Sequence, residues 1–353
     1  MKKRALTAIS MAAVMAFGLA GCGSSAATST AAPASEAAAA TYEAAAAAAT
    51  DNSEIGEITL IMSQRDQFLS TLEEAASEAA KDMGITLSVQ DANQDTNKVM
   101  QFVETAANAG QKAVIVNMVD PETAASVIEA AGDMKVVFVN RVPADTSVLT
   151  DNAVYVGSDE NTSGAYQGEF LADYFEAQGK TEITYILLNG ILGQTSTTLR
   201  TESVLKALEE RGIKATEAQA PLACDYDRAE AMNQMSTVLS AGTEFDCIIS
   251  NNDEMALGAI EAMQNAGLDP ASIPIVGIDA TADGCAAIVN GTLAMSVFQN
   301  PVGQGAGSLQ AAVNLINGDA LNANTEFEVD AETGHILWVP FEPVTADNVA
   351  DYQ

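Results

Sequence analysis

Short apolar runs alternate with helically spaced apolar residues along most of this chain. The clearest unit lies at 247–264, where a short apolar run, 247–249, precedes small polar residues and then apolar residues at helical spacing. The run predicts a buried strand of a parallel sheet, and the spacing that follows predicts a helix. Asn252 or Asp253 is suited to cap that helix. The unit therefore places polar side chains at the carboxyl end of a strand, where open α/β sheets bind ligands.

The same alternation continues from residue 57 to the carboxyl terminus. Strands are predicted by the apolar runs at 57–62, 85–89, 113–118, 136–139, 154–156, 183–188, 247–249, 275–278 and 294–298. Helices are predicted at 98–109, 164–175, 228–239 and 303–316, and also after Phe68, from Pro121 and up to Arg211. Short connections between strands and helices favour doubly wound parallel sheets. The alternation of strands and helices occurs in two successive series along the chain, which favours two α/β lobes of similar size.

The first residues form a processing signal rather than part of the fold. Three basic residues at 2–4 precede an apolar segment, 5–20, that is too short to span a membrane comfortably. It ends in Leu-Ala-Gly-Cys at 19–22, which resembles the lipobox of bacterial lipoproteins and implies a lipid anchor on Cys22. Residues 23–54 are rich in Ala, Ser and Thr, so we expect a disordered tether there.

Composition narrows the possible partners. The chain has 353 residues, 48% of them hydrophobic, which suffices for two lobes of ordinary size. Its net charge of −33 argues against nucleic acid, because phosphates need a basic surface. Cys224, Cys247 and Cys285 show no CxxC spacing, so a disulfide framework is not expected, although one pair could close. No later apolar stretch is long enough to span a membrane.

Neither a catalytic set nor a cofactor motif stands out in the sequence. The single histidine, His335, and the lack of a cysteine cluster argue against a zinc site, and no nucleotide-binding glycine motif occurs. A glycosidase would need two carboxyl groups facing one bond, and nothing singles out such a pair. We therefore expect a binding protein with no metal and no cofactor, and not an enzyme.

Polar residues follow apolar runs in both halves of the chain. They are Asp66, Asn140, Asn252, Asp253, Asp279 and Gln299, joined by Arg200 in a helix that follows a loop. A carboxylate accepts two hydroxyl protons at once, and an amide or guanidinium group donates to sugar oxygens. Phe68 and Tyr226 lie in polar loops, where an aromatic ring can stack on the apolar face of a sugar. Each residue alone could equally be a cap or a surface group, but their recurrence at strand ends favours a cleft.

Residues 57–352 resemble the galactose/glucose-binding family of type I periplasmic binding proteins. The segments that carry the resemblance are Asn-Asn-Asp-Glu-Met-Ala-Leu-Gly-Ala at 251–259 and those at 117–121, 136–143, 155–159, 205–214, 273–279, 338–341 and 347–352. The resemblance implies two doubly wound α/β lobes joined by a hinge of three strands, with crossovers near residues 158, 299 and 338. The lobes that it implies comprise 55–158 with 299–337, and 159–298 with 338–353.

The resemblance also implies that ten residues contact the ligand. They are Asp66, Phe68, Asn140, Gln194, Ser196, Arg200, Tyr226, Asn252, Asp279 and Gln299. Among them, Asp66 and Phe68 match the carboxylate and the stacking aromatic of the first lobe, and Asn140 matches an amide contact. Arg200 matches the arginine of the family's cleft, and the second lobe supplies further matching contacts.

Several of these positions depart from the galactose/glucose pattern. Gln194 and Ser196 replace a His and an Asp, so a strong acceptor for sugar hydroxyls is lost, and their loop resembles the ribose-binding version almost as well. Tyr226 replaces a stacking Trp, and Gln299 stands where galactose/glucose proteins have Asn and ribose-binding proteins have Gln. Residues 178–182 are too few and too poor in carboxylates for the family's calcium loop, so no structural calcium is expected.

These features predict a lipid-anchored receptor on the outer face of the cytoplasmic membrane. As a monomer it would deliver a monosaccharide, with galactose or glucose favoured, to a membrane ABC permease. Ribose, xylose or another pentose or furanose stays open, as does a sensor that serves chemotaxis or signalling without transport. A transcription regulator with the same core would need an N-terminal DNA-binding motif, which the signal segment and the acidic charge disfavour.

Overall fold

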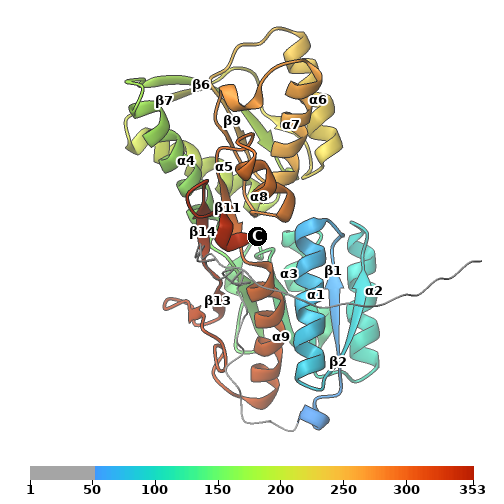
Figure 1. Ribbon diagram of the computed structural model, residues 1–353. Helices are drawn as coiled ribbons and strands as arrows, with labels where there is room; N and C mark the ends of the chain where they lie inside the picture. Colours follow the sequence, from blue (N-terminus) through green and yellow to red (C-terminus); the bar gives the residue numbers. More distant parts are fainter. Residues whose placement is uncertain (1–51) are drawn as a thin grey trace, which may run out of the picture. The chain divides into compact units, whose positions relative to one another are not determined.

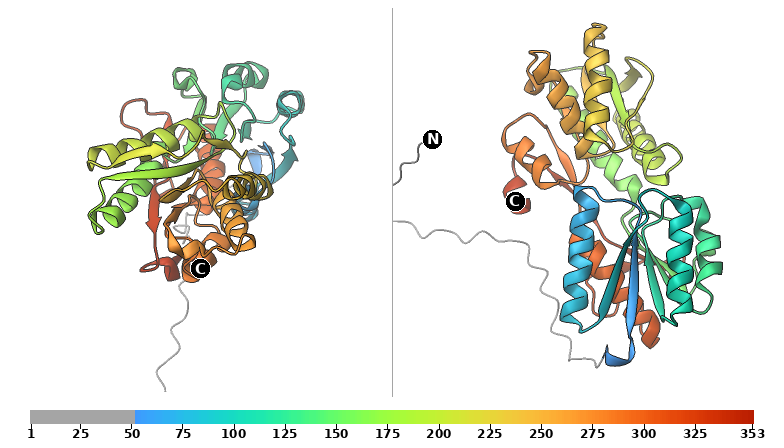
Figure 2. Two further views of the ribbon diagram at one scale, coloured as in Figure 1. Left: turned by 90° about the horizontal axis from the view of Figure 1, so that it is seen from above. Right: turned by 90° about the vertical axis from the view of Figure 1, so that its right-hand side faces the viewer.

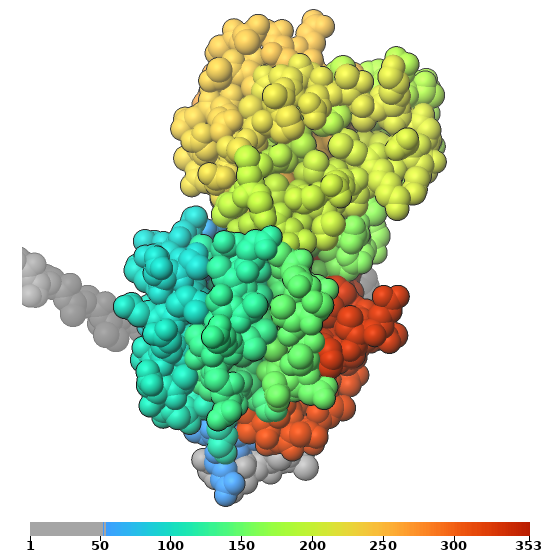
Figure 3. Space-filling model, turned by 180° about the vertical axis from the view of Figure 1, so that it is seen from behind, coloured from blue at the N-terminus to red at the C-terminus, as the bar shows by residue number. Residues whose placement is uncertain are grey.

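The structure, a computed structural model, describes residues 52–353 (Figure 1). The signal segment predicted at 1–22, with Cys22, and nearly all of the tether predicted at 23–54 lie outside the described residues. The described chain folds around two separate sheets with helices on both faces of each, and Figure 3 shows the two parts as distinct masses. We call the part built on the larger sheet the first lobe and the part built on the smaller sheet the second lobe.

The first lobe contains a seven-stranded sheet in the order β12-β13-β5-β4-β3-β1-β2. Its strands are β1 (Glu57–Met62), β2 (Thr86–Asp91), β3 (Ala113–Val116), β4 (Lys135–Val139), β5 (Ala153–Gly157), β12 (Glu328–Val329) and β13 (Ile336–Trp338), all parallel except β12. Its helices are α1 (Gln67–Asp82), α2 (Thr96–Asn108), α3 (Ala124–Ala131) and α9 (Pro301–Asn317). Helices α1 and α9 cover one face of the sheet, and α2 and α3 cover the other (Figure 2). Both faces of the central strands are therefore buried, which fits their continuous apolar sequences.

The second lobe contains a five-stranded parallel sheet in the order β10-β9-β6-β7, with β8 also paired to β6. Its strands are β6 (Glu182–Asn189), β7 (Lys214–Glu217), β8 (Leu222–Ala223), β9 (Cys247–Ser250) and β10 (Ile275–Val276). Its helices are α4 (Glu160–Glu176), α5 (Thr195–Glu210), α6 (Arg228–Ser240), α7 (Asp253–Asn265) and α8 (Ala282–Val289). Residues of α4 and α5 form the core on one face, and residues of α6, α7 and α8 form it on the other. The predicted α/β class with two doubly wound sheets is confirmed.

A third, two-stranded sheet stands apart from both. It pairs β11 (Ser296–Gln299) with β14 (Phe341–Val344) in antiparallel register, so that Gln299 lies opposite Phe341. The chain leaves the larger sheet after β5, returns to it through α9 after β11, and leaves it again after β13. Three chain segments therefore run between the two lobes, and the boundaries assigned to the lobes from the sequence remain a prediction.

Two sequence predictions differ from the structure near β10. The strand predicted at 275–278 is only two residues long, because beyond it the chain forms isolated bridges from Val276 to Met295 and from Asp279 to Phe298. The helix α8 was not predicted, since its eight residues include a glycine and show no clear apolar period. Thr281 caps it by accepting a hydrogen bond from the Gly284 amide at 3.1 Å.

Three further expectations from the sequence concern disulfides, membrane-spanning helices and metal sites. Cys224, Cys247 and Cys285 are buried free thiols, so no pair of them closes. Within residues 52–353, no helix has both the length and the apolar character needed to cross a bilayer. In the same residues, no three His, Cys, Asp or Glu side chains are grouped so that they could hold a metal ion.

Candidate functional site

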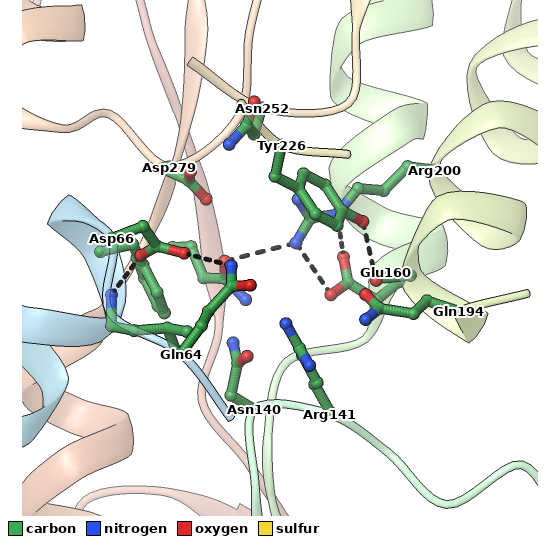
Figure 4. A pocket seen from close by; sticks show the side chains of 14 residues that line it. Gln64, Asp66, Asn140, Arg141, Glu160, Gln194, Arg200, Tyr226, Asn252 and Asp279 are labelled. Carbon is green, nitrogen blue, oxygen red and sulfur yellow. Dashed lines mark hydrogen bonds and ion pairs between the residues drawn. The ribbon is translucent and has the colours of Figure 1, made fainter. Parts of the chain in front are cut away.

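A pocket lies where the carboxyl ends of the strands of both lobes meet (Figure 4). Its lining residues are Gln64, Asp66, Phe68, Leu69, Asn140, Arg141, Glu160, Gln194, Ser196, Arg200, Tyr226, Asn252, Asp279 and Gln299. All ten residues predicted from the sequence are therefore brought to one cavity, although their contact with a ligand remains a prediction.

Asp66 begins the wall that the first lobe contributes. It follows β1 and caps α1, with Oδ1 accepting a hydrogen bond from the Leu69 amide at 2.7 Å. Its Oδ2 accepts a hydrogen bond from Gln64 Nε2 at 3.1 Å. Capping and binding are thus compatible for this residue, because a carboxylate offers about four acceptor positions and these bonds use two of them.

Asn140 and Arg141 follow β4 and form the floor of the cavity in Figure 4. Asn140 has a φ of 66°, a left-handed conformation that Asn tolerates better than most residues, and its Nδ2 donates to Gln304 Oε1 at 3.1 Å. Arg141 is 8% exposed and donates from Nη1 to the Met118 carbonyl at 2.8 Å. Burial lowers the pKa of Arg141, and within the described chain no carboxylate lies at ion-pair distance from it. Its remaining N–H groups therefore favour a ligand as their partner.

Arg200 reaches the cavity from α5 and is held by a buried ion pair. Its Nε and Nη2 donate to Glu160 at 2.6 and 2.9 Å. Its Nη1 donates to the Asn251 carbonyl at 2.7 Å, and Nη2 also donates to Gln299 Oε1 at 3.3 Å. Burial opposes the charge of this guanidinium, but the Glu160 carboxylate raises the pKa of Arg200 above its ordinary value. Four of the five N–H donors are thus occupied, which leaves one for a ligand.

Asn252 and Asp279 lie above the cavity, after β9 and β10. Asn252 caps α7 through Oδ1, which accepts from the Met255 amide at 3.0 Å, and this leaves Nδ2 free to donate toward the cavity. No group of the described chain donates a hydrogen bond to the Asp279 carboxylate, which is 6% exposed. Burial raises the pKa of Asp279 well above its usual value, an effect that Arg200 opposes. Hydroxyl donors of a ligand would supply the partners that this carboxylate lacks.

Asp253 was grouped with the polar residues at strand ends, but it does not line the cavity. It accepts from Ser296 Oγ at 2.6 Å and from the Thr281 amide at 2.9 Å. Gly277 and Gly284 pack so closely on its carboxylate that a side chain at either would collide with it. Asp253 is therefore an anchor of the second lobe and not a ligand contact.

Aromatic and aliphatic groups supply the apolar part of the cavity. Phe68 and Leu69 come from the first turn of α1, and Tyr226 comes from the loop before α6 with a φ of 63°. The Tyr226 ring packs on Gly190, where any side chain would overlap the ring. Its hydroxyl lies 3.0 Å from Ser196 Oγ and also hydrogen-bonds Thr197. Ser196 therefore fixes the aromatic ring in addition to lining the cavity.

Three amide groups in the cavity wall have a buried polar atom without a partner. These atoms are Gln64 Oε1, Gln194 Nε2 and Gln299 Nε2. Buried polar atoms are nearly always hydrogen-bonded in folded proteins, so each one favours a polar ligand. Arg200 fixes one of them, because it donates to Gln299 Oε1 and leaves Nε2 directed at the cavity.

Four lining residues were missed in the sequence: Gln64, Leu69, Arg141 and Glu160. Arg141 directly follows Asn140 at a strand end, so its position was a usable signal. Glu160 lies in the first turn of α4, three residues after the end of β5, so its position near a strand end was also a usable signal. Its role depends on a contact with Arg200, which is 40 residues away in the chain.

Comparisons with known proteins agree with this architecture. A family model described as a periplasmic binding protein domain matches residues 58–320. A putative rhizopine-binding protein of Rhizobium meliloti is 34% identical over 82% of this chain and 89% of its own. A D-galactose/methyl-galactoside binding periplasmic protein of Haemophilus influenzae is 30% identical over 81% and 88%. An ABC transporter solute binding protein of Bacillus halodurans, solved with bound myo-inositol, is 31% identical with a TM-score of 0.74 and covers 86% of this chain and 99% of its own.

Proposed function

Since this chain belongs to the periplasmic binding protein family, we propose that its cavity captures a six-membered polyhydroxylated ring for an ABC transporter. The family consists of solute receptors that act outside the cytoplasmic membrane, and the chain is a sugar-class binding protein rather than an enzyme. The observation that carries the ring proposal is that polar groups approach the cavity from every side in Figure 4.

A cyclitol of the myo-inositol type is the favoured ligand. Every carbon of such a ring carries a hydroxyl group, and each hydroxyl both donates and accepts a hydrogen bond. The cavity offers donors from Arg141, Gln194 and Asn252 and acceptors from Asp66 and Asp279, spread over both lobes. The solved relative that holds myo-inositol supports the same class.

An aldohexose is the second candidate. The sequence favoured galactose or glucose, and the relative named for galactose and methyl-galactoside supports that choice. The absence of an acidic residue at position 196 counts against it, because Ser196 already pairs with the Tyr226 hydroxyl. A pentose or furanose would leave more of the unpartnered donors without an acceptor.

We propose that the two lobes close on the ligand because the closed state binds it more tightly than the open state. A ring that contacts Asp66 and Arg141 from the first lobe and Asp279 and Asn252 from the second stabilises any state in which both sets touch it. Phe68 and Tyr226 would cover the C–H faces of the ring.

The anchoring and delivery steps rest on the sequence. We propose that Cys22 carries a lipid, that 23–54 forms the tether, and that the monomer delivers its ligand to a membrane permease. A receptor that serves a sensor would carry the same cavity. Disruption of the permease gene distinguishes the two roles, because it should stop uptake of the ligand only if the protein serves transport.

Thermal unfolding of the mature protein with myo-inositol, galactose, glucose, ribose and xylose tests the ligand class. A ligand at 100 times its Kd stabilises the native state by about 2.7 kcal/mol, which raises the midpoint measurably. We expect the largest rise with myo-inositol, and a much smaller rise for Asp279→Asn, whose affinity should fall about a hundredfold. A rise with ribose or xylose alone would refute a cyclitol or hexose as the ligand.

A further inference from the structure

A row of polar side chains follows the carboxyl edge of the larger sheet. We call it the edge network, and its members are Ser63, Asn117, Asn140, Gln304 and Ser158. The two serines and the two asparagines each come directly after one of the adjacent strands β1, β3, β4 and β5, and the glutamine lies in α9. Of the five, Asn140 alone lines the cavity, and the other four are at most 3% exposed.

Backbone groups fix the direction of the hydrogen bonds in the edge network. The Ser63 amide donates to Asn117 Oδ1 at 3.2 Å, and Asn117 Nδ2 donates to the Val139 carbonyl at 3.1 Å. A backbone N–H group only donates and a carbonyl only accepts, so these partners allow one orientation of the Asn117 amide. In that orientation, Asn117 Nδ2 also donates to Asn140 Oδ1 at 3.2 Å.

The same direction continues through Asn140 to the hinge. Because Asn140 Oδ1 accepts from Asn117, its Nδ2 is the group that faces Gln304, and it donates to Gln304 Oε1 at 3.1 Å. Gln304 Nε2 in turn donates to Ser158 Oγ at 3.0 Å. Ser158 begins the first chain segment between the lobes, and α9 directly follows the second. The network therefore joins the Asn140 amide to two of the three segments of the hinge.

These bonds leave Asn140 with a defined pair of free positions. Its amide has two N–H groups and two acceptor positions, of which Gln304 takes one N–H and Asn117 takes one acceptor position. One donor and one acceptor remain, which suits a ligand hydroxyl that both accepts and donates. Within the described chain, Gln304 is the one acceptor that holds Asn140 Nδ2.

We propose that Gln304 is a positioning residue for ligand binding that acts through Asn140. It holds the amide so that one donor and one acceptor of fixed identity face the bound ring, and it does not line the cavity itself. This inference rests on the proposed function and adds to it, since a residue outside the cavity then sets the affinity of the site.

A double-mutant cycle, measured by titration calorimetry with myo-inositol, tests the positioning role. Galactose replaces myo-inositol if it binds the wild type more tightly. Gln304→Met keeps a side chain of similar length but removes both amide bonds, and we expect affinity to fall about tenfold. Asn140→Ala should lose at least as much. The variant that combines both changes should lose no more than Asn140→Ala alone, because Gln304 acts through Asn140.

Gln310→Met is the matched control. Gln310 is a buried glutamine of the same helix, its Nε2 donates to Asn314 Oδ1 at 2.8 Å, and it does not line the cavity. Gln310→Met should lower the free energy of unfolding about as much as Gln304→Met does, while affinity stays within about twofold of the wild type. The two variants together separate positioning from a general weakening of α9.

Ser158→Ala tests the hinge end of the network independently. It removes one oxygen atom and leaves Gln304 Nε2 without the acceptor that fixes its orientation. We expect affinity to fall about threefold in the wild type and not to fall further in Asn140→Ala. This comparison decides the question if Gln304→Met does not fold.

Several results would overturn the positioning role. One is unchanged affinity in Gln304→Met, or in Ser158→Ala where Gln304→Met does not fold. Others are losses that simply add to that of Asn140→Ala, and equal losses of affinity for Gln304→Met and Gln310→Met. If the wild type binds no ring at all, the proposed function fails and this inference fails with it, whereas ring binding that does not depend on Gln304 removes the positioning role alone.

Discussion

The turns after β9 and β10 each carry a buried aspartate, and the two aspartates have opposite environments. Asp253, after β9, is fully buried and accepts hydrogen bonds from Ser296 and Thr281. Asp279, after β10, faces the cavity, and its carboxylate receives no hydrogen bond from the described chain. The same residue type at equivalent positions of neighbouring strands thus serves the fold in one turn and the site in the other.

The first aspartate also braces the second. Asp279 and Ala280 have φ values of 119° and 48°, which are unfavourable for residues with a side chain. Asp253 holds Thr281 directly, and its partner Ser296 accepts from the Ala280 amide at 3.0 Å. The backbone that directs Asp279 into the cavity is therefore held by the carboxylate that does not reach it. A buried carboxylate indicates a ligand contact only when the protein leaves it without partners.

Removing the bracing carboxylate should have the largest effect. Asp253→Ala leaves the Ser296 hydroxyl and the Thr281 amide buried without an acceptor, so we expect a loss of about 3 kcal/mol in the free energy of unfolding. Urea denaturation without ligand measures it. The folded protein should still bind within about tenfold of the wild type. A stable variant that cannot bind would mean that the two aspartates have been assigned the wrong way round.

Asp279→Asn should produce the reverse pattern. The amide is nearly the same size but loses the charged acceptor for ligand hydroxyls, so we expect affinity to fall about a hundredfold, or about 2.7 kcal/mol. Stability without ligand should stay equal or rise, because an unpartnered buried carboxylate is removed. Calorimetry and urea denaturation on one preparation give both numbers. A loss of stability as large as that of Asp253→Ala would contradict the comparison.

The free energy of unfolding should depend on pH through the buried carboxyl group of Asp253. Burial raises the pKa of Asp253 to about 7, against about 3.9 in an unfolded chain, so the folded state binds more protons between these values. Stability contributed by this group is therefore present at low pH and is lost as pH rises, by about 2 kcal/mol between pH 5 and pH 7. Asp253→Asn should reduce this slope, and the raised pKa of Asp279 accounts for a part that remains. An unchanged slope in Asp253→Asn would assign the proton to another group.

The sequence predicted the composition of the site better than its internal order. Apolar runs locate the strand ends, and parallel strands bring those ends to one edge, so Asp66, Asn140 and Asp279 were predictable. The difference between Asp253 and Asp279 was not predictable in this way. It depends on Ser296 and Thr281, which meet Asp253 only through the tertiary fold.

Glu160 also shows that tertiary contacts cannot be predicted from local sequence. Its position after β5 marks it only as a residue near a strand end, and its bidentate pair with Arg200 across 40 residues is not visible in the sequence. The fold itself was more accessible, since apolar runs or helical spacing mark most of its longer strands and helices. The short elements around β10 escaped because β10 gives way to isolated bridges after two residues and α8 is too short to show an apolar period.

The smallest effect separates two adjacent residues of the turn after β9. Asn252 directs Nδ2 at the cavity while Oδ1 caps α7, and Asp253 points into the core. Asn252→Asp keeps the cap oxygen, and the gain from a charge at a helix N-terminus is offset by the burial of that charge in the same cavity as Asp279, so the free energy of unfolding should change little. It removes one donor to the ligand, so affinity should fall about tenfold, or about 1.4 kcal/mol. Unchanged affinity would mean that Asn252, like Asp253, stabilises the fold and does not contact the ligand. Asp279 would then be the ligand contact that remains in the turns after β9 and β10.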